Sequence, residues 1–233
     1  MRLDKFLCES TDLTRSKAKK ALHRGEVTVG GQVVKDASFH VADDDEVHWL
    51  EERLVSFGHR YLMMHKPAGV ECTTQSGLYP TVLELIELPK VERLHPVGRL
   101  DVDTTGLVLL SDDGQWSHRV TSPRAACAKV YLADLVDAFD EPARERASRQ
   151  FAEGIQLDGE KKPTQPATLE WLTPTAVRIV ITEGKYHQVK RMIAAVGNRV
   201  GTLHRESIGP LSLDEGLAPG ECRHLTQDEI EAF

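Results

Sequence analysis

The sequence predicts an α+β protein in two parts: a small N-terminal domain and a larger domain built on a mixed, mostly antiparallel sheet. Short apolar runs of strand length outnumber the helical patterns and do not alternate strictly with them, which argues against a parallel βαβ fold. The pattern changes near Arg60, where a compact basic segment gives way to a longer series of apolar runs. A chain of 233 residues with 40% hydrophobic residues is long enough for both parts. We therefore expect an N-terminal domain at 1–48, a linker at 49–59 and a second domain at 60–233.

Two helices and a hairpin are expected in the first domain. Leu3, Phe6 and Leu7 recur at helical spacing. Thr14 is a suitable N-cap for a second helix, and Gly25 is a typical residue at a helix C-terminus. The strands of the hairpin are expected at 27–29 and 32–34, because the two glycines between them permit the positive φ angles of a tight turn.

Basic side chains gather in this first domain, although the whole chain carries a net charge of −7. A charge run is usually a solvated helix face, but lysine and arginine on an exposed helix can also hold RNA phosphates. The basic helix and the segment from Gly25 to Gly31 resemble the alpha-L RNA-binding motif, which is shared with a small-subunit ribosomal protein. The candidate RNA-binding residues here are Arg2, Arg15, Lys17, Lys19, Lys20 and Arg24.

In the second domain the order of elements follows from apolar runs and turn residues. Strands are expected at 61–65, 106–111, 130–135, 167–172, 177–182 and 200–204, with 70–73 continuing the first of them. Helices are expected at 81–86, 115–120, 141–152 and 187–196. Thr226 and Glu229 have the spacing of a capping box, which predicts a last helix at the C-terminus.

The segment Gly98-Arg99-Leu100-Asp101-Val102-Asp103 is the best candidate for chemistry. A carboxylate held at a turn before a strand can act as a nucleophile, although an aspartate at a turn commonly makes only local hydrogen bonds. A calcium loop through Asp101, Asp103 and Asp112 would need flanking helices and a terminal glutamate, which this sequence does not predict. A glycoside hydrolase would need two facing acids, whereas Asp101 and Asp103 would point in opposite directions in an extended segment.

Four blocks, in this order, resemble the pseudouridine synthases that act on ribosomal RNA. They read RYLMMHKPAG at 60–69, HPVGRLDVDTTGLVLLSDDG at 95–114, KVY at 129–131 and ITEGKYHQVKRM at 181–192. The string GQWSHRVTSPR at 114–124 and the form EGKYHQVKRM are most similar to the small-subunit branch of that family. The resemblance extends from Met1 to Leu225, which makes a chance similarity very improbable.

The resemblance implies that a uridine of 16S rRNA, at position 516, is isomerised to pseudouridine. Nothing is oxidised or added in this reaction, so no cofactor and no metal are expected. Asp101 would be the essential carboxylate, which either attacks the anomeric carbon or removes a sugar proton to give a glycal. Lys190 would be the cation beside it, with Arg191 as the fallback. Tyr131 would stack on the target base or accept a proton, and stacking on an aromatic ring is worth about 1–3 kcal/mol per base.

Three further residues receive supporting roles from the same resemblance. Because chemistry on a paired base requires the nucleotide to be flipped out, Arg99 would occupy the vacated stack and contact phosphate. Lys66 would support the active-site loops or bind RNA, unless it is a surface lysine. The histidines do not share metal-ligand spacing, and we expect core or hydrogen-bonding roles for His95, His118, His187 and His204.

Composition bounds the compartment and the partners. The four cysteines lack CxxC spacing and suit a reducing cytosol. No segment approaches the roughly 20 apolar residues of a membrane span, and the N-terminus lacks the apolar run of a signal peptide. We expect a cytoplasmic monomer that acts on 16S rRNA or on a small-subunit assembly intermediate. The alternatives are a large-subunit synthase of the same family and a non-catalytic rRNA-binding assembly factor; the presence of Asp101, Tyr131 and Lys190 favours an enzyme.

Overall fold

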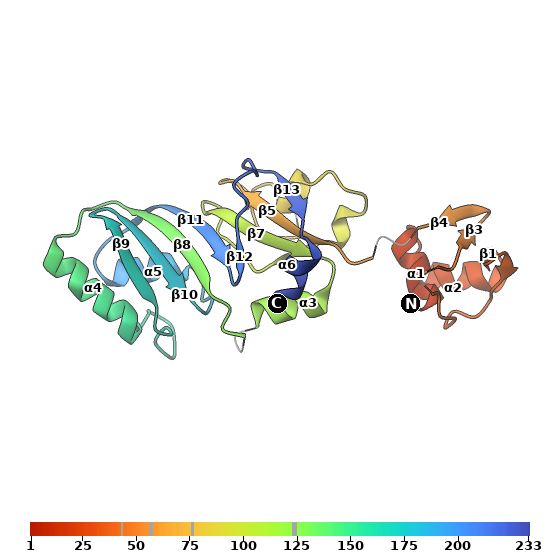
Figure 1. Cartoon of the computed structure of the whole chain (residues 1–233), viewed down its shortest axis with the longest axis horizontal. Coiled ribbons are helices and arrows are strands. Elements are labelled where there is room, and N and C mark those ends of the chain that lie inside the picture. The colour runs from red at the N-terminus through yellow and green to blue at the C-terminus, as the bar shows by residue number, and fades with distance from the viewer. Residues whose placement is uncertain (43, 56–57, 76, 123–124) are drawn as a thin grey trace. The chain divides into compact units, whose positions relative to one another are not determined.

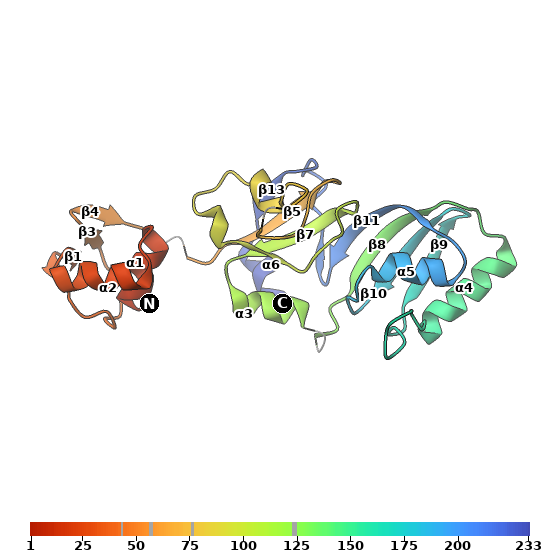
Figure 2. The same ribbon diagram turned by 180° about the vertical axis from the view of Figure 1, so that it is seen from behind.

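The structure is a computed structural model that describes residues 1–42, 44–55, 58–75, 77–122 and 125–233. The chain forms two compact units, Met1–His59 and Arg60–Phe233, which are described separately below and can be followed in Figures 1 and 2. The first unit holds two helices and a small sheet, and the second holds a large mixed sheet with helices beside it.

The first unit has the expected helices and hairpin. Thr14 Oγ1 accepts a hydrogen bond from the Lys17 amide, so it caps the second helix. Gly25 ends that helix in the left-handed conformation, with φ of 75°. Gly30 and Gly31 both have positive φ, which is the geometry that the hairpin turn needs. The elements are α1 (Leu3–Ser10), α2 (Arg15–Arg24), β1 (Val27–Val29), β2 (Gln32–Val33), β3 (Val47–Trp49) and β4 (Glu52–Leu54).

The sheet of the first unit is antiparallel, with the order β2-β1-β3-β4. Its β4 strand corrects the predicted linker at 49–59, because Glu52–Leu54 pairs with β3 and belongs to the first unit. One apolar cluster fills the space between the sheet and the two helices, to which α2 contributes Ala18, Ala21 and Leu22. The opposite face of α2 is therefore left to the charged residues.

A large sheet of nine strands forms the second unit. Its main order is β13-β5-β7-β11-β8-β10-β9, while β6 pairs with β7 and β12 pairs with β11. Only the β7–β11 pair is parallel among these pairs, so the predicted mixed, mostly antiparallel sheet is confirmed. The strands are β5 (Tyr61–Lys66), β6 (His95–Val97), β7 (Thr105–Ser111), β8 (Lys129–Leu135), β9 (Thr168–Thr173), β10 (Ala176–Ile181), β11 (Val200–Ile208), β12 (Leu211–Ser212) and β13 (Cys222–His224).

The central strand β7 is buried on both faces, as its apolar run predicts. Val108 and Leu110 belong to one apolar cluster, and Leu107 and Leu109 belong to another on the opposite face. The α5 helix lies behind the β8–β10–β9 strands in Figure 1 and in front of them in Figure 2. The helices are α3 (Gly114–Thr121), α4 (Glu141–Glu153), α5 (Gln188–Ala195) and α6 (Gln227–Glu231), with the 3-10 turns η1 (Val82–Leu85) and η2 (Val91–Arg93).

Some expected elements differ in the structure. The segment 70–73 does not extend β5; instead Glu71 makes an isolated bridge with Thr81. The helix expected at 81–86 is a 3-10 turn, held by a capping box between Thr81 and Glu84. The β11 strand runs on to Ile208, because its second half continues to pair with β8 beyond a bulge. None of the described helices has the length and apolar composition needed to cross a membrane.

Candidate active site

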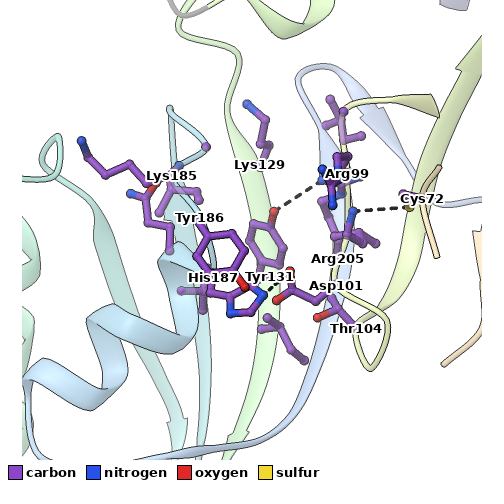
Figure 3. A pocket seen from close by; sticks show the side chains of 18 of the residues that line it. Cys72, Arg99, Asp101, Thr104, Lys129, Tyr131, Lys185, Tyr186, His187 and Arg205 are labelled. Carbon is purple, nitrogen blue, oxygen red and sulfur yellow. Dashed lines mark hydrogen bonds and ion pairs between the residues drawn. The ribbon is translucent and has the colours of Figure 1, made fainter. Parts of the chain in front are cut away.

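A cleft of about 1000 Å³ opens in the second unit. Its walls come from the loop at 98–104, from β8 and β11, and from the segment at 181–190 that leads into α5. Figure 3 shows Asp101, Tyr131, His187 and Arg205 directed into this space from different parts of the chain. Of the predicted site residues, the structure brings together Arg99, Asp101, Tyr131 and Lys190.

Asp101 lies in the loop between β6 and β7, where a tight turn fixes its backbone. The Thr104 amide donates to the Asp101 carbonyl at 3.1 Å. The side chain is one-quarter exposed and lies at the cleft wall. Its carboxylate is held by two side chains of the other wall: Lys190 Nζ lies 2.9 Å from Oδ2 and His187 Nε2 lies 3.3 Å from Oδ1. A carboxylate whose two oxygens are held from the opposite wall in this way is fixed in position.

Lys190 is the cation that the sequence assigned to Asp101. It projects from the first turns of α5, and its ammonium contacts Asp103 Oδ1 at 2.6 Å as well as Asp101. Partial burial would lower the pKa of Lys190, but the hydrogen bonds to Asp103 and Asp101 outweigh it, so the pKa is raised above its ordinary value. Lys190 therefore remains an ammonium throughout the neutral range.

Asp101 and Asp103 meet at the same ammonium, which corrects the expectation that they point in opposite directions. The segment is a turn and not an extended strand, so the alternation of side chains does not apply. The two carboxylates differ in exposure, since the Asp103 side chain is 68% exposed and that of Asp101 is 26% exposed. The hydrogen bond from Lys190 is the main cause that lowers the pKa of Asp103.

His187 and Tyr186 form a stacked pair at the edge of the cleft. Their ring centroids lie 3.8 Å apart, with an interplanar angle of 20°. His187 has a φ of 47°, which is uncommon for a residue other than glycine, and it stands directly before α5. The Tyr186 ring is largely exposed, so the pair offers a flat aromatic surface to solvent beside Asp101.

Tyr131 lies on β8 and is almost fully buried, with its ring at the cleft. Arg205, its cross-strand partner on β11, is 2% exposed. Arg205 Nη1 lies 3.4 Å from the Tyr131 hydroxyl oxygen, and Nε donates to the Leu107 carbonyl at 2.8 Å. Gly106 permits the close pairing of β7 with the backbone of Arg205, because a Cβ at that position would lie 2.3 Å from the Arg205 carbonyl oxygen.

Lys66 is not available to bind RNA, which corrects one of its two predicted roles. Its side chain is fully buried, and its ammonium donates to the carbonyls of Pro67, Val102 and Thr104. Burial lowers the pKa of this ammonium. These bonds hold the loop that carries Asp101. The contacts of Lys66 therefore fit its other predicted role, which is to support the active-site loops.

Arg191 and Arg99 have different surroundings. Arg191 does not line the cleft; its guanidinium contacts Glu160 and the carbonyls of Asp158 and Tyr186. It is therefore not the cation beside Asp101, and a contact of Arg191 with RNA stays a prediction. Arg99 is exposed at the cleft wall, two positions before Asp101, as a residue that contacts substrate would be.

The six candidate RNA-binding residues of the first unit fall into two groups. Arg2 and Arg24 are engaged by carboxylates, with Arg2 Nη2 at 3.0 Å from Asp4 and Arg24 bonded to Glu26. The others are exposed around α2 and make no ion pair with a described residue. They are Arg15, Lys17, Lys19 and Lys20.

Arg205 and Lys129 were not predicted from the sequence, and His187 was not placed beside Asp101. Lys129 stands two positions before Tyr131 and therefore on the same face of β8, which was a usable signal. Arg205 lies in a strand without clear alternation, because a bulge follows it.

Among the described residues, no group of three or more His, Cys, Asp or Glu side chains is placed to hold a metal ion. Asp112, the third residue of the rejected calcium loop, is instead paired with Arg60 at 2.9 Å.

Two protein-family models match the chain. The RNA pseudouridylate synthase model covers residues 60–195, which include Asp101, Tyr131 and Lys190. The S4 domain model covers residues 1–47. Ribosomal small subunit pseudouridine synthase A of Haemophilus influenzae is 51% identical over 232 residues, which are 99% of this chain and 98% of that protein.

The chain belongs to the small-subunit rRNA pseudouridine synthase family. The synthase A of Vibrio cholerae is 50% identical over 233 residues, and that of Escherichia coli K12 is 49% identical over 231. A solved structure described as a crystal structure of pseudouridylate synthase is 49% identical, covers 100% of this chain and 99% of its own, and has a TM-score of 0.70. As a member of this family of RNA isomerases, the chain is an enzyme with an S4 domain at its N-terminus.

Proposed function

We propose that this synthase isomerises one uridine of 16S rRNA to pseudouridine, at position 516 by family resemblance, with Asp101 as the essential carboxylate. The observation that carries the proposal is the geometry of Asp101. Its carboxylate lies at the wall of a cleft that also contains Tyr131, and the Lys190 ammonium holds it at 2.9 Å. A carboxylate that is partly buried and held in position at a cleft wall can act as a nucleophile or a base on a bound nucleotide.

The reaction needs only groups that the cleft supplies. The bond between C1′ and N1 breaks, the uracil turns, and C5 bonds to C1′ in place of N1. Asp101 either attacks C1′ to give an ester or removes the C2′ proton to give a glycal, and an ionised carboxylate serves both routes. Lys190 and His187 keep the two oxygens of Asp101 in place during the change of charge at the sugar.

Tyr131 is the proposed stacking partner for the target uracil. It lies at the cleft on β8, and its hydroxyl contacts Arg205 of β11, so its ring can hold a base after the glycosidic bond is cut. A uridine in a helix reaches such a cleft only if the nucleotide is flipped out. Arg99, exposed at the wall, is positioned to contact the RNA from which the base has left.

The S4 domain is the proposed docking site for the RNA backbone. Arg15, Lys17, Lys19 and Lys20 are exposed, and phosphate contacts from such side chains give affinity without reading the sequence. The stack of Tyr186 and His187 adds a flat surface of the kind on which unpaired bases pack. These features suit folded rRNA or a small-subunit assembly intermediate.

A map of pseudouridines in 16S rRNA tests the proposal. Cells with and without this gene product would be compared by carbodiimide-dependent stops of reverse transcription. We expect one stop in 16S rRNA to disappear without the protein and to return with the wild-type gene. A lost stop in 23S rRNA instead would favour the large-subunit alternative. An unchanged map of both RNAs would favour a non-catalytic assembly factor.

A further inference from the structure

Two cations at the Tyr131 end of the cleft, Arg205 and Lys129, do not contact Asp101 or Asp103. Arg205 is 2% exposed, and its Nη2 is buried without a hydrogen-bond partner among the described residues. Lys129 is partly buried, and its ammonium donates to the Cys127 carbonyl at 2.9 Å. Both side chains line the cleft, and Figure 3 shows them with Tyr131 on the neighbouring strands β8 and β11.

Neither cation makes an ion pair with a carboxylate in the part of the chain that the structure describes. A buried charge without a counterion is costly. Burial lowers the pKa of Lys129, and the charge of Arg205 lowers it further, which is consistent with two like charges near each other. The Asp101 end differs, because there the Lys190 ammonium is already matched by two carboxylates. The carboxylates thus outnumber the cation at the Asp101 end, whereas the Tyr131 end holds two cations without a carboxylate partner among the described residues.

The proposed reaction produces an anion at the place where these cations lie. When the bond between C1′ and N1 breaks, its electron pair remains on N1, and the base becomes uracilate with its charge shared among N1, O2 and O4. The sugar is held meanwhile as an Asp101 ester or as a glycal. A uracil stacked on Tyr131 would lie beside the tyrosine hydroxyl, where Arg205 Nη1 is found. On the ester route C5 bonds to C1′ as the C1′–O bond to Asp101 breaks and the carboxylate leaves. On the glycal route C2′ takes back a proton as C5 bonds to C1′. Loss of the C5 proton and protonation of N1 then complete the isomerisation on both routes.

We propose that Arg205 and Lys129 form an anion site that holds the detached uracilate while it turns. The inference rests on the proposed function and extends it to a binding site for the intermediate. Arg205 would bond to the base through its guanidinium edge, and Lys129 would supply a second positive charge. Because uracilate forms on both routes, the site serves the ester route and the glycal route equally. A phosphate of the flipped nucleotide is the other anion that such a pair could bind.

Equilibrium binding of three small probes to the full-length protein tests this site. The probes are uracil, inorganic phosphate and 6-azauracil, a base of the same shape that ionises at lower pH than uracil. Dissociation constants would be measured by ligand-observed NMR at a pH where 6-azauracil is largely ionised and uracil is neutral. For the wild type we expect 6-azauracil to bind about tenfold or more tightly than uracil, which is the scale of one hydrogen bond to a charged group.

The variants Arg205→Met and Lys129→Met should each reduce this preference, and Arg205→Lys should retain part of it. Lys185→Met is the matched control, because Lys185 also lines the cleft but is paired with Glu160. The Lys185→Met protein should prefer 6-azauracil over uracil as strongly as the wild type does. Thermal melting of each variant reports whether it is folded. If Arg205→Met is unfolded, Lys129→Met provides the test.

Three results would overturn the proposal. The first is equal affinity of the wild type for both bases. The second is a preference for 6-azauracil over uracil that persists in folded Arg205→Met and Lys129→Met. The third is a loss of phosphate binding alone in these variants, which would assign the site to phosphate. The measurement does not depend on turnover, so a failure here is distinct from a failure of Asp101 as the catalytic carboxylate.

Discussion

At the scale of single residues, the centre of the site is one ammonium shared by two carboxylates. Lys190 contacts Asp101 at 2.9 Å and Asp103 at 2.6 Å, but only the Asp101 side chain is largely shielded from solvent. We infer different roles for the two acids: Asp101 reacts with the nucleotide, and Asp103 helps to hold Lys190 in place. The raised pKa of Lys190 means that this arrangement stays charged above the ordinary range of a lysine.

Replacement of Lys190 by methionine tests this division of roles. We expect turnover to fall by about 100-fold or more, the usual effect of removing one preorganised charged donor. RNA affinity should change much less than turnover, because the phosphate contacts are assigned to the S4 domain and the Lys190 ammonium is already engaged by two carboxylates. Single-turnover rates and filter binding measure the two quantities. The control is Asp103→Asn, which keeps the contact between Lys190 and Asp101; a loss in Asp103→Asn as large as that in Lys190→Met would contradict the assignment.

The sequence predicted part of this centre. Asp101, Tyr131 and Lys190 were found because each stands in a recognisable block, and the structure brings all three to one cleft. The convergence of Asp103 on Lys190 was not predicted, because it depends on the turn that the Thr104 amide closes. Arg205 was missed for a similar reason: its burial depends on the parallel pairing of β11 with β7, and the two strands are separated by about 100 residues of sequence.

At the scale of elements, buried and bridging side chains hold short segments in place. Lys66 binds the carbonyls of the Asp101 loop, and the Gly69 amide adds a bond of 2.7 Å to the Val102 carbonyl. The C-terminal helix α6 is anchored in a comparable way. Arg223 forms two hydrogen bonds of 2.8 Å with the Glu229 carboxylate, and Trp116 Nε1 donates to the Ile230 carbonyl at 3.0 Å.

The anchor of α6 predicts a pH dependence of stability. The hydrogen bonds from Arg223 lower the pKa of Glu229 to about 2. A carboxyl whose pKa is lower in the folded state stabilises the fold above its unfolded pKa, near 4.3, and this contribution is lost as the pH falls towards 2. We expect Glu229→Gln to lower the free energy of unfolding by about 1–3 kcal/mol at neutral pH. The difference from the wild type should shrink between pH 4.3 and 2.

Urea unfolding of the two proteins at several pH values measures this difference. Asp228→Asn, an exposed change on the same helix, serves as the control and should have little effect. A difference between wild type and Glu229→Gln that stays constant down to pH 2 would show that the ion pair is not the cause.

At the scale of the whole molecule, the chain combines an RNA-binding unit with a catalytic unit. The sequence predicted both, since the basic helix, the glycine hairpin and the four blocks are local patterns. It placed the linker too early, because β4 is three residues long and its pairing with β3 follows a turn at Leu50 and Glu51 with positive φ and no glycine. The short strands β6, β12 and β13 were missed as well, since two or three residues carry no periodicity and their pairing is set by tertiary contacts.

The S4 domain predicts a specific salt dependence. Lys19→Gln together with Lys20→Gln should weaken RNA binding and reduce the slope of log K against log salt by about 0.7–0.9 for each phosphate that is no longer bound. Lys161→Gln with Lys162→Gln is the matched control, because it removes an adjacent pair of exposed lysines outside the S4 domain. Binding titrations at four or five salt concentrations give the slopes. Equal slopes for the two double variants would contradict a docking role for α2.

The proposed chemistry depends most on Asp101, and Asp101→Asn tests it most directly. The change keeps the size of the side chain and removes the negative charge that Lys190 and His187 hold. We expect single-turnover pseudouridine formation on 16S rRNA to fall by more than about a thousandfold, with RNA affinity close to that of the wild type. Pseudouridine formation within about tenfold of the wild-type rate would contradict the assignment of Asp101 as the essential carboxylate.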